Sequence, residues 1–426
     1  MIRPQPVDLA PWPLGGLLVP DVEGGEELCH AATRGLPIDD RSEPTLLRYF
    51  ELAAEDDTEG ALSSLQALDG LEGDENVIVR YNQLVLDPSE ARLSELRSLA
   101  TEGPIADMVE LAAFKSGLRE DIPDTPHLDG ELLASARIAR ATAALEAGDV
   151  HAASGLLDEA IQLARDSSPG LAAQLALSLV EIERQRGKGE DRLVELLRDS
   201  IELTAGEGFK TLTAEAQLEL GVVLQEAGPQ DHRRLTEASA LFQDALLALD
   251  PESHPRAHGF AQMRLGLTYL SMPMHDAGDA LRMGVATQAL QRAVDVLDAD
   301  REPDLWCSAA SNLANAYQLL PSGHLGDNLD KAIGLYDDAL GLRRGAGDPG
   351  GVARLLVNKA QAAASLERHD VAIASLEEAC PLMAELRWSD DLNAARHMME
   401  DLKRMTTARA DDPAKSSAGP GGVNLA

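Results

Sequence analysis

Three glycines in the segment GAGDPG, at positions 345, 347 and 350, form a G-x-G-x-x-G string, the pattern with which dinucleotide-binding folds hold a pyrophosphate. Such a site needs a strand before the string and a βαβ unit around it. Here the preceding residues have helical periodicity, and no G-x-x-x-x-G-K-[ST] sequence occurs in the chain. We therefore interpret these glycines as a loop between helices and expect no nucleotide cofactor.

The histidines and cysteines are the side chains that could serve as metal ligands or nucleophiles. His254 and His258 stand four residues apart, a spacing that can place two ligands on one helix face, but neither an H-E-x-x-H motif nor a nearby carboxylate follows them. The three cysteines, Cys29, Cys307 and Cys380, are far apart and form no C-x-x-C pair. The sequence therefore predicts no metal site, no cofactor and no catalytic residue, and it indicates a non-enzymatic protein.

A methionine-rich segment, SMPMHDAGDALRMGV, carries Met272, Met274 and His275. Soft ligands in one loop could bind copper or haem, but flexible methionines more often fill irregular gaps in packing. Pro273 is expected to end the preceding helix early, so that the segment protrudes as an extra turn. We rank packing first, a second candidate surface for a partner next, and a metal site last.

One helical pattern recurs around these residues. In residues 303–343, apolar side chains return at intervals of three and four in two stretches, and a turn sequence containing Pro321, Gly323 and Gly326 separates them. Similar pairs of stretches precede and follow this one. Each first stretch has a small residue at the same place, with steps of 45, 48 and 46 residues: Gly221, Gly266, Ala314 and Ala360. That regularity predicts an array of helical hairpins.

The repeated pattern resembles the tetratricopeptide repeat family, whose first helix has a Leu-Gly/Ala pair and a Tyr, and whose second helix has Ala, an aromatic residue or Leu, and Ala. The matching triplets are Leu265-Gly266-Tyr269 and Leu313-Ala314-Tyr317 for the first helix, and Ala238-Phe242-Ala245 and Ala332-Tyr336-Ala339 for the second. The central units here are longer than the family's 34 residues. The resemblance implies an all-α fold, a right-handed α-solenoid of degenerate and expanded hairpins that holds a partner.

Changes in composition divide the chain into five expected parts. They are an irregular arm rich in Pro and Gly (1–43), N-terminal helical hairpins that cap the array or are decayed repeats (44–126), the repeat array (127–388), a C-terminal capping helix (389–409) and a disordered tail (410–426). The cluster Leu17-Leu18-Val19 could dock the arm on a partner or, as we favour, on its own chain. Five apolar residues of the last helix are expected to seal the array: Leu392, Ala395, Met399, Leu402 and Met405.

The composition limits the possible partners. With 72 acidic and 37 basic residues, the chain has a formal net charge of −35. Nucleic acid binding needs clustered Lys and Arg, so we expect no nucleic acid partner. A basic protein surface fits better, although the charge could serve solubility alone. No stretch is long and apolar enough for a membrane span or has the form of a secretory signal, which together with the scattered cysteines indicates a cytoplasmic protein.

In the tetratricopeptide repeat family, the first helices line the concave side of the array. The resemblance therefore implies that six polar residues bind a segment of a partner: Arg264, Asn312, Asn315, Arg354, Asn358 and Gln361. The lysines of the family's carboxylate clamp are absent at these places. The expected function is a scaffold or adaptor for a protein or peptide, and a weaker resemblance to bacterial repeat proteins implies a role in assembly or maturation of a larger metalloenzyme complex. The alternative is a sensor that responds to a peptide or small molecule, and a homo-oligomer stays open.

Overall fold

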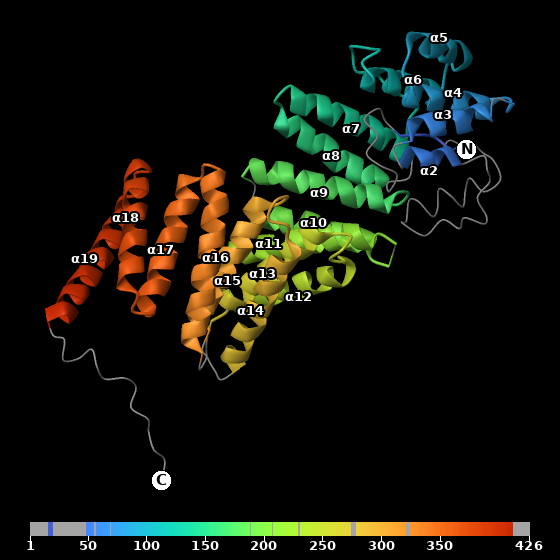
Figure 1. The fold of residues 1–426 in the computed structure, drawn as a ribbon. Coiled ribbons are helices and arrows are strands. Elements are labelled where there is room, and N and C mark those ends of the chain that lie inside the picture. Colours follow the sequence, from blue (N-terminus) through green and yellow to red (C-terminus); the bar gives the residue numbers. More distant parts are fainter. Residues whose placement is uncertain are drawn as a thin grey trace. The chain divides into compact units, whose positions relative to one another are not determined.

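The computed structural model describes residues 16–19, 48–54, 57–68, 70–187, 189–206, 208–228, 231–273, 278–320 and 324–411. The chain forms two compact units, Met1–Val223 and Leu224–Ala426. All the elements of the described residues are α-helices, joined in series as hairpins (Figure 1). The prediction of an all-α chain of helical hairpins is confirmed. The right-handed twist and the five-part division stay predictions.

Within residues 48–115, the described part of the first unit contains a bundle of five helices. These are α2 (Arg48–Ala54), α3 (Thr58–Gln66), α4 (Asp74–Leu86), α5 (Glu90–Leu99) and α6 (Pro104–Lys115). Their apolar residues form one core that includes Tyr49, Tyr81 and the arm residues Leu17, Leu18 and Val19. Pro104 lies in the first turn of α6, where the missing proline N–H costs no helical hydrogen bond. The cluster Leu17-Leu18-Val19 therefore docks on its own chain, as the sequence favoured.

Lys115, at the end of α6, is a partly exposed lysine whose ammonium group is perturbed. Burial lowers its pKa from the ordinary value of 10.5 to about 8. Between those two pH values the folded chain binds fewer protons than the unfolded chain, so the first unit should become more stable as pH rises from about 8 to 10.5. Below pH 8 the amine is protonated in both states, and the full cost of burying its charge is present.

Lys115→Met is therefore expected to stabilise the first unit at pH 7, by up to about 3 kcal/mol for a pKa shift of this size. Urea titrations of the variant and the wild-type protein at pH 7 and pH 10.5 measure this gain, which should nearly vanish at the higher pH. Lys210→Met, at an exposed position of the same unit, serves as the control and should give no such difference. An equal gain for Lys115→Met at both pH values would show that the amine is not the cause.

The rest of the first unit consists of longer, paired helices. These are α7 (Gly130–Glu146), α8 (Val150–Ala164), α9 (Pro169–Gln185), α10 (Glu190–Thr204) and α11 (Lys210–Ala227), the last of which ends in the second unit. Between α7 and α8 the chain turns at Gly148, whose φ of 79° lies in the left-handed region that favours glycine. Asp149 then caps α8, since its Oδ1 accepts a hydrogen bond from the N–H of Ala152 at 2.9 Å.

The second unit continues the hairpins to the end of the described chain. Its helices are α12 (His232–Ala248), α13 (Pro255–Ser271), α14 (Gly278–Val296), α15 (Pro303–Leu319), α16 (Leu325–Gly345), α17 (Pro349–Ser365), α18 (His369–Glu385) and α19 (Ser389–Asp411). Consecutive helices pack against each other throughout this series. The small residues of the repeat lie where these helices meet, and Ala314 and Ala360 are fully buried. The repeat pattern in the sequence therefore marks the contacts between helices.

Two expected loops can be followed in the second unit. The glycine string lies between α16 and α17, where Gly347 has a φ of 68°, so helices flank it on both sides and no strand precedes it. In the methionine-rich segment, Met272 is buried, and α14 begins at Gly278. Met274 and His275 lie outside the described residues. Within the described ranges, none of the helices combines the length and apolar character needed to cross a bilayer.

Candidate functional site

The first helices of the second unit's hairpins, α13, α15 and α17, carry the six polar residues expected to bind a partner. On α15, the Oδ1 of Asn315 accepts a hydrogen bond from the Tyr336 hydroxyl at 2.5 Å and another from the Asn358 Nδ2 of α17 at 3.3 Å. The Nε2 of Gln318 donates to the same hydroxyl at 2.7 Å. The structure thus brings Asn315 and Asn358 together, with Asn315 also tied to a buried tyrosine.

Arg264 and Asn312 differ in how free their side chains are. The Nη2 of Arg264 lies 2.8 Å from the Oε1 of Glu226, its side chain is only 16% exposed, and its guanidinium lies over the Phe260 ring. Arg264 therefore already has an ionic partner within the array. Asn312 is partly exposed, and its side-chain amide makes no hydrogen bond to the residues that the structure describes. Of these two, Asn312 is the one whose polar atoms are available to a ligand.

The other three residues, Arg354, Asn358 and Gln361, line a cavity of about 580 Å³ between α17 and α19. A second cavity of about 650 Å³ lies along the same two helices and shares Gln361 and Met398 with the first. We call this continuous depression the terminal groove. From α17 it is lined by Arg354, Val357, Asn358, Gln361, Ala364 and Ser365, from α18 and the turn before it by Glu367, His369 and Met383, and from α19 and the residue before it by Trp388, Asp391, Ala394, Ala395, Met398, Leu402 and Met405.

Trp388 fixes one end of the terminal groove. Its ring lies 3.3 Å from the position that a Cβ on Gly350 would take, so it packs against the first turn of α17. The guanidinium carbon of Arg354 lies 5.2 Å from the ring centroid, within range of a cation–π interaction. Arg354 is nevertheless exposed. This end of the groove can thus offer a flat apolar surface and a positive charge to the same ligand.

Trp388 and Met398 are not among the binding residues expected from the sequence, because the pattern of the last helix predicts only a cap. A signal was present, since Trp388, Asp391, Ala395, Met398, Leu402 and Met405 follow one another at intervals of three and four, which places them on one side of the helix. Ala395 and Leu402 are buried, as expected of a cap. The prediction that Met405 seals the array is wrong, because Met405 is 59% exposed and no described helix follows α19 to cover it.

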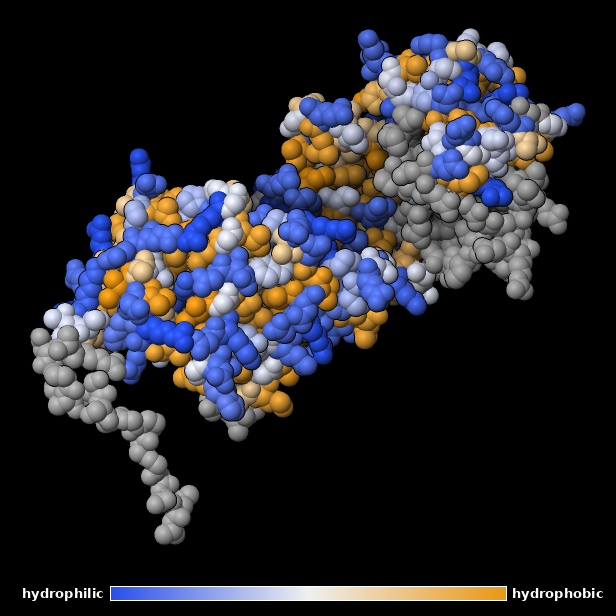
Figure 2. Space-filling view, in the orientation of Figure 1, coloured by the Kyte–Doolittle hydropathy of each residue, from blue (hydrophilic) through white to orange (hydrophobic). Residues whose placement is uncertain are grey.

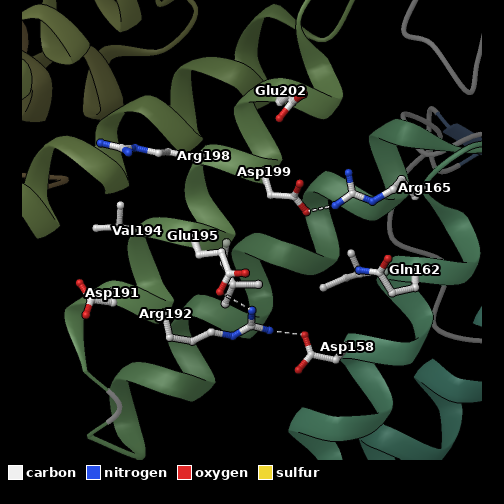
Figure 3. A pocket seen from close by; sticks show the side chains of 12 residues that line it. Asp158, Gln162, Arg165, Asp191, Arg192, Val194, Glu195, Arg198, Asp199 and Glu202 are labelled. Carbon is white, nitrogen blue, oxygen red and sulfur yellow. Dashed lines mark hydrogen bonds and ion pairs between the residues drawn. The ribbon is translucent and has the colours of Figure 1, made fainter.

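A third cavity, of about 510 Å³, separates α8 from α10 in the first unit. Figure 3 shows that Arg165 points toward Asp199 and Arg192 toward Asp158, and both pairs are in ion-pair contact across the gap. The bond to Asp199 raises the pKa of Arg165, so its charge is fixed. These arginine and aspartate side chains form ion pairs with one another. The cavity is therefore better explained as a gap between two helices than as a ligand site.

A buried polar cluster in the same unit could be mistaken for a catalytic centre. Ser154 is hydrogen-bonded to the carboxylate of Glu183, and the Nη1 of Arg186 donates to both residues, at 2.8 Å to Ser154 Oγ and 2.6 Å to Glu183 Oε1. His151 faces Arg186 Nη2 at 2.9 Å rather than the serine. A serine nucleophile needs a base on its own hydroxyl, and here the carboxylate beside it is paired with a guanidinium. The cluster is an ion pair at the end of α9 that Ser154 and His151 of α8 contact through hydrogen bonds.

The histidine pair of the sequence does not form a metal site with the groups around it. His258 Nδ1 lies 2.7 Å from the Leu249 carbonyl oxygen and its Nε2 lies 3.3 Å from Gln262 Nε2, so both ring nitrogens have neighbours in the chain. Throughout the described ranges there is no group of three His, Cys, Asp or Glu side chains placed to hold a metal ion. Cys307 is buried, and burial raises the pKa of its thiol, which disfavours the reactive thiolate.

No family model matches the sequence, and no curated protein matches it at a significant level. Several solved structures are similar to this chain at low sequence identity. The apo form of RapI is 10% identical, with 85% of this chain and 98% of that chain covered and a TM-score of 0.49. A Rap protein complexed with Competence and Sporulation Factor is 12% identical, with 86% and 98% covered and a TM-score of 0.39.

A signal transduction ATPase from Pyrococcus horikoshii, which has a tetratricopeptide repeat sensor, is 13% identical, with 92% of this chain and 59% of that chain covered and a TM-score of 0.41. At these identities the comparisons assign no activity or ligand to the chain. Its own features define the architecture: consecutive helical hairpins, small residues buried where the helices meet, and the repeated Leu-Gly/Ala and Tyr pattern. The chain is a helical-repeat protein whose hairpins resemble tetratricopeptide repeats.

Proposed function

We propose that this protein is a non-enzymatic, cytoplasmic scaffold or adaptor that binds a segment of a partner protein along the first helices of its second unit. The observation that carries the proposal is the terminal groove, where three of the six residues expected from the sequence line one continuous depression together with Trp388 and Met398. Asn312 and Asn315, on the neighbouring first helix, would extend the contact. Arg264 would contribute at its far end once released from Glu226.

The groove supports a particular kind of ligand. Toward the end of α19 it has an apolar row of Met398, Leu402 and Met405, in a cavity that Glu367 and His369 also line. In the other cavity, Arg354 and Asp391 can each meet an opposite charge or a backbone group. Elsewhere on the face of the second unit visible in Figure 2, apolar and hydrophilic side chains alternate. A partner segment with spaced apolar side chains would therefore find more contact area in the groove than on that face.

The charge of the chain supports a partner with a basic surface around that segment. With a formal net charge of −35, the protein attracts cationic surfaces over the range of the Debye length, about 8 Å at physiological salt. Such steering increases the association rate more than the final affinity. A larger assembly under construction, for example a metalloenzyme complex, would present surfaces of this kind only until its subunits have joined. Neither nucleic acid nor a membrane is part of this proposal.

Met405→Glu is expected to reduce capture of the partner at least tenfold, since it places a charge in the apolar row of Met398, Leu402 and Met405. Affinity capture from native lysate, at low and at moderate salt, measures the loss for the dominant captured protein. Leu247→Glu is the matched control, because Leu247 is 88% exposed on α12 and lines none of the cavities described above. Both substitutions change exposed positions, so helicity should be unchanged in both variants.

If Met405→Glu and Leu247→Glu captured equal amounts of the partner, the terminal groove would not be the binding site. Asn312→Ala tests separately whether the contact extends from the terminal groove to α15. The side-chain amide of Asn312 makes no hydrogen bond to the described residues, so its loss should leave the melting temperature unchanged. Recovery of the wild-type protein alone at every salt concentration would argue against the scaffold function itself.

A further inference from the structure

Four residues of the N-terminal arm, Gly16 to Val19, occupy a slot in the helical bundle of the first unit. The side chains of Leu17, Leu18 and Val19 are fully buried there, in the same core as residues of α2 and α4. Twenty-eight residues separate Val19 from Arg48, where α2 begins, so the segment is distant in sequence from the helices that hold it.

The slot holds the backbone of this segment at three points. Asn82 of α4, which is 0% exposed, forms two hydrogen bonds of 2.7 Å with Leu18: its Nδ2 donates to the carbonyl oxygen and its Oδ1 accepts from the N–H. The Tyr49 hydroxyl donates to the same carbonyl oxygen at 2.9 Å, and the Tyr81 hydroxyl donates to the Gly16 carbonyl oxygen at 3.1 Å. Residues 16–19 have no polar side chains, so all these contacts are made to the main chain.

This pattern is what a receptor for an extended peptide requires. Main-chain groups that leave water must find partners, and the amide of Asn82 supplies both a donor and an acceptor to one residue. Hydrogen bonds to the main chain give affinity whatever the sequence, while pockets for the side chains select apolar residues. The groups that make these contacts, Asn82, Tyr49 and Tyr81, are all uncharged, and burial raises the pKa of the Tyr81 phenol, which stays neutral.

We propose that the slot is a binding site for an uncharged, extended segment of the Leu-Leu-Val type in a partner protein, and that the chain's own arm is its resident occupant. A tethered arm competes at an effective concentration in the millimolar range, so the partner must add contacts outside the slot to displace it. A second copy of this chain is a poor source of the segment, since two molecules with a formal net charge of −35 repel each other.

The test uses the full chain with a protease site introduced between residues 20 and 47, cut after folding, and a fluorescent peptide of residues 14–20, LGGLLVP. Before cleavage the tethered arm should keep peptide binding weak. After cleavage and removal of the arm fragment, the peptide should bind at least tenfold more tightly. A peptide in which aspartate replaces the leucine corresponding to Leu18 should not bind.

Asn82→Asp is the decisive variant, because a carboxylate cannot donate to the Leu18 carbonyl oxygen and repels it. In the cleaved protein it should weaken peptide binding at least tenfold, and Tyr49→Phe, which removes a single donor, should weaken it a few-fold. Three results would overturn the proposal: a cleaved protein that stays helical but binds no peptide, a protein that unfolds when the arm leaves, and an uncut protein whose dimers disappear in Asn82→Asp. The second would make the arm part of the core, and the third would make a second copy the occupant.

Discussion

Gly266→Leu is expected to lower the free energy of unfolding of the second unit by about 3 kcal/mol or more. Gly266 lies on α13 where it meets α14, and a Cβ at this position would lie 2.7 Å from Leu290 Cγ and 3.0 Å from the Ala286 carbonyl oxygen. Leu290 and Ala286 are both fully buried. Because one of the two obstacles is backbone, the helices would have to separate to admit a side chain.

Gly284→Leu is the matched control for this substitution. Gly284 lies on α14, and nothing lies within 4 Å of a Cβ built there. Leucine also has a better helix propensity than glycine, so this variant should be unchanged or more stable by up to about 1 kcal/mol. Chemical denaturation of both variants, followed by circular dichroism, gives the comparison. Similar losses for both would show that the penalty comes from the α-helical backbone and not from the contact between α13 and α14.

Tyr336→Ala is expected to cost about 3 to 5 kcal/mol of stability, in the range measured for large aromatic side chains removed from a core. Tyr336 is among the largest fully buried side chains and belongs to the core that joins α15, α16 and α17. Burial raises the pKa of its phenol well above the ordinary value, so the hydroxyl stays protonated and can donate to Asn315.

Tyr336→Phe separates the hydroxyl from the ring. It should cost about 1 to 2 kcal/mol of stability. The side-chain Oδ1 of Asn315 would keep only the longer hydrogen bond from Asn358, and Gln318 Nε2 would lose its acceptor. Tyr269→Phe removes an exposed hydroxyl bonded to Gln243 and should cost less than about 0.5 kcal/mol. Thermal denaturation of the three variants measures these differences. A Tyr336→Phe protein as stable as Tyr269→Phe would mean that the hydrogen bonds of Asn315 do not support the fold.

The hairpins could be predicted from the sequence because close contact between helices requires small residues, and Gly266, Ala314 and Ala360 recur with the period of the fold. The terminal groove could be predicted only in part, since the spacing from Trp388 to Met405 marks one side of the last helix but does not reveal how that helix packs beside α17. Asn315 was expected to face a ligand, and the repeat pattern could not reveal that a tyrosine of the following helix would engage its side chain.

The docking of the arm was predicted in outline, but the residue that holds it was not. Asn82 lies 64 residues from Leu18, in a helix whose apolar period gives no hint of a buried amide. Two hydrogen bonds between residues far apart in the chain produce no periodic pattern that a single sequence would reveal. Three consecutive apolar residues in a stretch rich in proline, in contrast, can be recognised in the sequence. Burial could thus be anticipated, and its specific partner could not.

The gap between α8 and α10 affects how this part of the array responds to force. The two helices are connected across it by Arg165 with Asp199 and Arg192 with Asp158, all of which are partly exposed. Ion pairs of this kind contribute little stability, and dissolved salt weakens them further. Long side chains that meet across an open gap can also lengthen or turn without breaking a packed core. We therefore expect the spacing of α8 and α10 to be elastic and to soften at high ionic strength, while the packed contacts of α9 with α8 and α10 stay stiff.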